Sequence, residues 1–158
     1  MRSLTRPLLF STLLLAGCGV LPHGKADRNA RPEPAAATSA FSSTSARQCL
    51  ADLGTAGVRY QALPNREFGG GCRTVDTVQL LDIGVPTTNL GALTCPLAAG
   101  FSAWARYAVQ PAARQMLGSD VVKIETMGTY ACRNINGAGS GKLSQHALAN
   151  AVDVSAFV

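Results

Sequence analysis

Positions 144–153 read Ser-Gln-His-Ala-Leu-Ala-Asn-Ala-Val-Asp, which places the second of the chain's two histidines seven residues before a carboxylate in a mostly apolar segment. Imidazole and carboxylate groups are ligands that zinc takes at catalytic sites, where three protein ligands leave a fourth position for water. His146 and Asp153 are therefore a candidate pair of metal ligands. The alternative, a half-buried histidine beside a carboxylate with a structural role only, is equally compatible with this spacing. Ser144 can order the turn that carries His146, and Arg133 can pair bidentately with a carboxylate or a developing oxyanion.

Hydrophobic periodicity around this segment predicts an α+β domain that starts near Arg47, with packed helices and a small mixed sheet. A short helix from Arg47, closed by Gly54 and Gly57, and a second from Cys95 to Leu117 are expected, with strands over 58–63, 75–83, 121–126, 129–133 and 151–157. Pro111 should kink or restart the second helix, and Gly118 should end it. Segments 64–71 and 134–141 are expected to be loops, 144–150 a turn or short helix, and Trp104 a residue of the core.

The N-terminus has the pattern of a bacterial lipoprotein signal peptide over residues 1–17. Two arginines precede an apolar run over 8–15, which is shorter than the ~20 residues that a membrane-spanning helix needs. The run ends in Leu15-Ala16-Gly17-Cys18, which resembles a lipobox, so we expect Cys18 to carry diacylglycerol and anchor the chain stably through several acyl chains. In the Gram-negative lipoproteins that this pattern resembles, a residue other than Asp after the cysteine favours the outer membrane, so Gly19 implies that location, facing the periplasm. An ordinary secretory signal cut after Gly17 is the alternative.

Residues 18–46 are rich in Ala, Ser, Thr, Pro and Arg and show no apolar period. Such a composition cannot bury enough surface to offset its chain entropy. It predicts a flexible tether from the lipidated Cys18 to the domain. His23 lies in this tether and is expected to be solvated.

Besides Cys18, the chain has an even number of cysteines, namely Cys49, Cys72, Cys95 and Cys132. In a chain bound for an oxidising compartment, this predicts two disulfides. We favour Cys49–Cys72 and Cys95–Cys132, because the first bridge then stays local and the second ties the middle helix to the strand that enters the candidate site. A structural zinc held by four thiolates is disfavoured, since no C-x-x-C pair is present.

The formal charge of the chain is +5, and removing the two arginines of residues 1–17 leaves +3. The positive residues are scattered, with no basic run and no interleaved aromatic stripe. Nucleic-acid binding is therefore disfavoured. A modest attraction to anionic cell-wall polymer or lipid head groups remains.

The run Ser144-x-His146-x-x-Ala149-x-Ala151-x-Asp153 resembles the SxHxxGxAxD signature of zinc D-alanyl-D-alanine carboxypeptidases and dipeptidases, whose fold is shared with Hedgehog signalling domains. Ala149 stands where that signature has glycine. Segment 128–133 is similar to the Ser-Gly-Tyr-Arg element of those enzymes, with two residues inserted. A closer likeness, over 49–158, is to the bacterial extensin-like C-terminal domain family. It is carried by Cys95-Pro96-Leu97-Ala98, the Trp104 helix, Val109-Gln110-Pro111-Ala112-Ala113, Tyr130-x-Cys132-Arg133 and Leu143-Ser144-x-His146-Ala147-x-Ala149-Asn150-Ala151-x-Asp153.

This resemblance implies that residues 47–158 form an extensin-like domain with the carboxypeptidase/Hedgehog-like fold. It implies zinc as the cofactor, His146 and Asp153 as its ligands, Ser144 as a group that supports them, and Arg133 as a contact to the substrate or transition state. It also implies a later histidine-rich element and a catalytic glutamate that this chain lacks. We therefore expect a domain that is partial at its C-terminus, with an incomplete zinc site.

Three functions are open at this point. The chain could be a zinc-dependent hydrolase of cell-wall peptides, or an envelope module that binds peptidoglycan peptide or a partner around Arg133 and His146 without catalysis. The third is an inactive, truncated relative of such an enzyme. For each of these functions we expect the protein to be located in the cell envelope and attached to the membrane through its lipid anchor. The sequence gives no indication of an oligomeric state.

Overall fold

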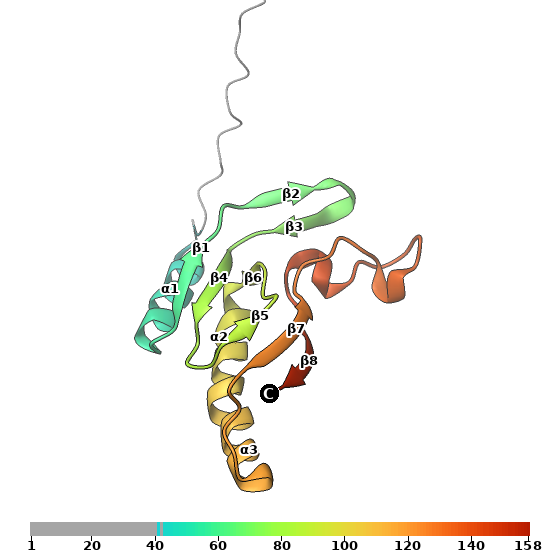
Figure 1. The fold of residues 1–158 in the computed structure, drawn as a ribbon. Helices are drawn as coiled ribbons and strands as arrows, with labels where there is room; N and C mark the ends of the chain where they lie inside the picture. The colour runs from blue at the N-terminus through green and yellow to red at the C-terminus, as the bar shows by residue number, and fades with distance from the viewer. Residues whose placement is uncertain (1–40, 42) are drawn as a thin grey trace, which may run out of the picture. The chain divides into compact units, whose positions relative to one another are not determined.

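The structure is a computed structural model that describes Phe41 and residues 43–158, and it has the α+β character expected from the sequence (Figure 1). The helices are α1 Thr44–Thr55, α2 Cys95–Trp104 and α3 Gln110–Leu117, with a π-helical segment η2 at Ala105–Val109 and short 3-10 turns η1 Gly69–Gly71, η3 Ile135–Gly137 and η4 Gln145–Leu148. The strands are β1 Arg59–Ala62, β2 Arg66–Phe68, β3 Cys72–Thr74, β4 Thr77–Asp82, β5 Thr87–Thr88, β6 Leu93–Thr94, β7 Ile124–Gly128 and β8 Asp153–Phe157. Lipidation at Cys18 and most of the predicted tether lie outside the described residues. The end of that tether was placed too late, because α1 begins at Thr44 and both Phe41 and Ala46 are buried in the core. Within the described part, no helix is both long and apolar enough to cross a membrane.

The strands form three small sheets among the described residues, where the sequence predicted one. Their orders are β1-β4-β6, β2-β3 and β5-β7-β8, and the pairing is antiparallel except for the parallel pair β5 and β7. The β2–β3 hairpin occupies part of segment 64–71, where a loop was expected. Its three-residue strands are too short to show a period in the sequence, because alternation needs at least four residues to be recognised.

The core lies where α1 and α2 pack against the β1-β4-β6 sheet. Leu53, Val78 and Leu93 are fully buried there, and Ile124 closes the same apolar cluster from β7. Burying each of these side chains contributes roughly 1.5–3 kcal/mol relative to leaving it in water. The prediction that Trp104 belongs to the core was wrong: the residue is 40% exposed, and its ring contacts those of Phe101 and Phe157. The face of α2 that meets the sheet consists instead of small residues and Phe101, as in Cys95, Ala98, Phe101 and Ser102.

The α2–α3 helix contains a π-helical segment just before Pro111. The backbone N–H of Gln110 bonds to the carbonyl of Ala105, five residues earlier, instead of four. Proline has no N–H to donate and its ring crowds the preceding turn, so the wider turn accommodates it without breaking the helix. The helix then ends at Gly118, whose φ of 68° is the left-handed conformation that glycine tolerates best.

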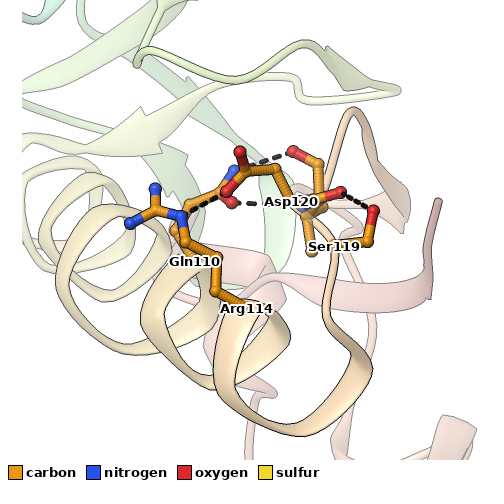
Figure 2. A network of polar contacts seen from close by, with 5 residues as sticks. Gln110, Arg114, Ser119 and Asp120 are labelled. Atoms are coloured by element: carbon orange, nitrogen blue, oxygen red, sulfur yellow. Dashed lines mark hydrogen bonds and ion pairs between the residues drawn. The ribbon is translucent and has the colours of Figure 1, made fainter.

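A polar network holds α3 against the segment that leads into β7 (Figure 2). The Gln110 amide binds both backbone groups of Val121: its oxygen accepts from the N–H at 3.1 Å and its nitrogen donates to the carbonyl at 2.7 Å. Arg114 and Asp120 form an exposed ion pair beside it, and the Ser119 hydroxyl donates to the Asp120 carbonyl. The glutamine therefore serves as the partner that Val121 would otherwise find in a strand.

Two disulfides are present, but the favoured pairing was wrong. Cys49 bonds to Cys95 with a Cα–Cα distance of 6.2 Å, and Cys72 bonds to Cys132 with a Cα–Cα distance of 5.5 Å. The first bridge joins α1 to the start of α2, because these helices pack side by side. The second joins the β2–β3 hairpin to the segment before Arg133. Proximity along the chain was a poor guide, since tertiary packing decides which Cα atoms come within bonding range.

The expected strand over 129–133 was also wrong. Gly128 has a φ of 118°, a conformation that L side chains rarely adopt, and it turns the chain away from the sheet at the end of β7. The following residues run as irregular backbone toward an isolated bridge between Asn134 and Leu143. The alternation of Thr129, Ala131 and Arg133 therefore reflects no strand.

Candidate functional site

His146 lies in the short 3-10 turn η4, which its neighbours define. Ser144 caps the turn, and its hydroxyl accepts a hydrogen bond from the His146 N–H at 3.3 Å. Ala149 ends the turn in the left-handed conformation, with a φ of 53°, and is fully buried. This conformation costs a non-glycine residue roughly 1–2 kcal/mol. The turn faces the molecule's interior, so that only 10% of the His146 side chain is exposed.

The backbone of Thr129 fixes the orientation of the imidazole. His146 Nδ1 lies 2.9 Å from the Thr129 carbonyl oxygen. A carbonyl oxygen can only accept, so Nδ1 carries the hydrogen and donates it. Nε2 is thereby left to face the other way, toward Asp153 Oδ2 at 3.2 Å. The same arrangement, with one ring nitrogen donating to a carbonyl, commonly orients metal-binding histidines.

The facing atoms Nε2 and Oδ2 need a positive charge between them. A neutral imidazole with hydrogen on Nδ1 presents a lone pair at Nε2, and a carboxylate presents lone pairs as well. At 3.2 Å two such groups repel each other unless a cation is shared. A proton on Nε2 gives an imidazolium–carboxylate ion pair, and a metal ion gives a common coordination. The geometry therefore supports either a charged pair or a cation site.

Arg133 and Asp153 form the open side of the site. Asp153 begins β8, which pairs with β7, and its side chain is 47% exposed. The guanidinium nitrogen Nη2 of Arg133 lies 4.0 Å from the same Oδ2. Two backbone bonds tie the arginine segment to η4: the Ser144 N–H donates to the Arg133 carbonyl, and the Ala131 N–H donates to the His146 carbonyl. The structure thus brings together all four residues that the sequence singled out.

The donor atoms fit part of a zinc site. Zinc bonds of about 2.0–2.1 Å in a tetrahedral arrangement place two ligand atoms roughly 3.3 Å apart, close to the separation of Nε2 and Oδ2. No group of three His, Cys, Asp or Glu side chains placed to hold a metal occurs among the described residues. The four cysteines of this part are bonded in disulfides and supply no thiolate. His146 and Asp153 can therefore be two ligands, and the described residues supply no third.

Sequence reasoning missed the contribution of Thr129. Its carbonyl orients His146, and its side chain is buried with a hydroxyl that has no hydrogen-bond partner. No sequence signal marks a carbonyl oxygen, because every residue has one. The resemblance of segment 128–133 to a known element was the only pointer to this region.

The family described as Extensin-like protein C-terminus matches residues 47–158. The chain belongs to the extensin-like C-terminal family. This match includes Arg133, Ser144, His146 and Asp153, so the site lies within the region that defines the family. Searches of curated proteins and of solved structures found no match to this extensin-like chain.

Proposed function

We propose that this extensin-like protein is a lipid-anchored protein of the cell envelope whose domain resembles zinc-dependent peptidoglycan peptidases and acts on cell-wall peptide. One observation carries the proposal. The Thr129 carbonyl fixes His146 so that Nε2 lies 3.2 Å from Asp153 Oδ2, a separation that fits two ligands of one zinc ion. An imidazolium–carboxylate ion pair also fits this separation, and zinc content distinguishes the two arrangements.

His146 and Asp153 would hold the zinc. When bound, zinc supplies a Lewis acid and makes a coordinated water more acidic. Arg133 lies at the open side with 40% of its side chain exposed, where its planar guanidinium can take a substrate carboxylate or a developing oxyanion in two parallel hydrogen bonds. Ser144 keeps the turn in place through the His146 N–H.

The envelope location rests on three features of the chain. The Leu15-Ala16-Gly17-Cys18 run supports lipidation at Cys18, and the glycine at position 19 supports the outer membrane with the domain in the periplasm. The two disulfides support an oxidising compartment, since cytosolic proteins rarely keep such bonds. Peptidoglycan is the peptide-bearing polymer of that compartment.

A second function is a binding module without catalysis. It is favoured by the shortage of metal donors, because the described residues offer a pair of ligands where a catalytic zinc takes three. In this case a protonated His146 would pair with Asp153, and the cluster with Arg133 would bind cell-wall peptide through its charges.

Zinc content distinguishes these functions. The full chain, stripped of metal and then incubated with zinc, is passed through a desalting column and measured by inductively coupled plasma mass spectrometry. We expect one zinc per chain, lost in His146→Ala and retained in His23→Ala, which removes the chain's other histidine. A chain that holds no zinc, or that loses it equally in both variants, contradicts the metal site and leaves the binding module. Release of amino acids or peptides from purified peptidoglycan, compared between the parent and His146→Ala, then tests hydrolysis.

A further inference from the structure

A cleft of about 460 Å³ lies between the β2–β3 hairpin and the end of β7. The hairpin contributes Arg66, Phe68 and Thr74, and the opposite wall includes Asn89 and segment 128–130. This volume is within the range of about 300–1,000 Å³ that small-molecule and peptide-fragment sites occupy. In Figure 1 the hairpin extends above β5 and β6 and reaches toward the orange segment that carries η4.

The hairpin presents two chemically different faces. In its antiparallel register Arg66 is opposite Thr74 and Phe68 is opposite Cys72, whereas Glu67 is opposite Arg73. Because side chains alternate across a strand, the first set shares the face that lines the cleft and the second set lies on the other face. Arg66 and Arg73 are thus two arginines of one hairpin, of which only Arg66 lines the cleft.

The cleft shares a wall with the site of His146. Thr129 lines the cleft, and its carbonyl is the acceptor for His146 Nδ1. The Cys72–Cys132 disulfide holds the hairpin to the residue next to Arg133. A molecule in the cleft therefore lies against the same short segment that orients the imidazole and supplies Arg133.

The lining has the chemistry of a site for an anionic peptide. Arg66 is the one charged residue that lines the cleft, and no hydrogen bond or ion pair to its guanidinium occurs among the described residues. Beside it, the Phe68 and Tyr130 rings lie 5.2 Å apart and form an aromatic wall. The Tyr130 hydroxyl and the Thr129 hydroxyl are buried without a partner, which leaves polar groups beside the cleft that a ligand can satisfy after a small movement.

We infer that this cleft binds a cell-wall peptide through a carboxylate that pairs with Arg66, while apolar parts of the peptide lie on Phe68 and Tyr130. The inference rests on the proposed function, since it names how that substrate is recognised. A guanidinium binds a carboxylate in a bidentate geometry that an amide cannot reproduce, so the site distinguishes a free carboxylate from its amide. Peptidoglycan stem peptides carry such a free carboxylate on D-glutamate, and some carry the amide instead.

The test uses two synthetic probes that differ only in this group, L-alanyl-γ-D-glutamyl-L-lysine amide and the same peptide with D-isoglutamine. Binding to the full chain is measured by isothermal titration calorimetry in the presence of a chelator. We expect Arg66→Gln to weaken binding of the carboxylate probe at least roughly tenfold. Arg73→Gln is the matched control and should leave the affinity within about twofold. The isoglutamine probe should bind as weakly to the parent as the carboxylate probe binds to Arg66→Gln.

Three results would overturn the inference: no saturable binding of the carboxylate probe at millimolar concentration, equal binding of both probes, or equal losses in Arg66→Gln and Arg73→Gln. The measurement contains no metal, so failure of the zinc site leaves its outcome unchanged. Zinc binding with no carboxylate preference would retain the proposed function and remove the role of the cleft.

Discussion

Gly91 packs so closely on Thr129 that adding one methyl group should destabilise the protein. A Cβ at position 91 would lie 2.9 Å from Thr129 Oγ1, closer than such atoms approach in proteins. Thr129 is only 2% exposed and is β-branched, so its buried side chain has little freedom to turn the hydroxyl away. The backbone of Gly91 needs no positive φ, which makes the contact the sole obstacle. Overpacking of this kind costs about 1–3 kcal/mol, and we expect that loss of unfolding free energy in Gly91→Ala.

A double-mutant cycle isolates this contact. Thr129→Ala removes the hydroxyl, which has no hydrogen-bond partner to lose, and it opens room for the new methyl group. The double variant should therefore be at least about 1 kcal/mol more stable than the sum of the two single effects predicts. Urea unfolding is followed by the fluorescence of Trp104, which contacts Phe101 and Phe157 in the native state. Gly54→Ala is the control, because nothing lies within 4 Å of its new Cβ and alanine favours helix α1 by up to about 1 kcal/mol.

Additivity would refute this reasoning. If the double variant loses the sum of the two single losses within about 0.5 kcal/mol, the contact between Gly91 and Thr129 carries no energy. A Gly91→Ala variant as stable as the parent would contradict it as well.

Two further predictions concern stability. Replacing Cys72 and Cys132 together by serine should lower the free energy of unfolding by about 4 kcal/mol, because this bridge closes a loop of 60 residues. Removing the Cys49–Cys95 bridge, which closes a loop of 46 residues, should cost nearly as much. Urea unfolding of the two double variants measures both losses, and a large loss in only one of them contradicts the loop-entropy account. Gln110→Ala should lower the free energy of unfolding by about 1–3 kcal/mol, because the backbone N–H and carbonyl of Val121 both lose their partner. Arg114→Ala removes only the exposed ion pair of Figure 2 and should lower it by less than about 1 kcal/mol. Thermal unfolding of both variants measures these losses. Equal losses of stability in Gln110→Ala and Arg114→Ala would contradict the larger role given to Gln110.

Local chemistry in the sequence was enough to predict several elements. Cys95-Pro96 begins α2, because proline suits the first turn of a helix, and Gly118 ends α3 in the left-handed conformation. Ser144 caps the turn of His146 as expected. Each of these features depends on residues within one turn of each other, so the sequence carries the necessary information locally.

The tertiary features were beyond the sequence. The pairing of Cys49 with Cys95 depends on how α1 packs against α2, which no local pattern specifies. The β2–β3 hairpin has strands of three residues and is held by the Cys72–Cys132 bridge and by the contact of Phe68 with Tyr130. Elements held by distant contacts leave a weak local signal.

Several places where local rules fail lie close to His146, as is common at functional sites. Ala149 adopts a left-handed conformation that costs energy, and Gly91 approaches Thr129 as only a glycine can. Two of the buried hydroxyls without partners, on Thr129 and Tyr130, belong to the same segment. Strained backbone and unsatisfied polar groups persist where the surrounding structure enforces them, and they concentrate at active and binding sites. An ordinary core histidine needs none of these costs, because one hydrogen bond to a carbonyl satisfies its N–H and a water or hydroxyl can satisfy its other ring nitrogen.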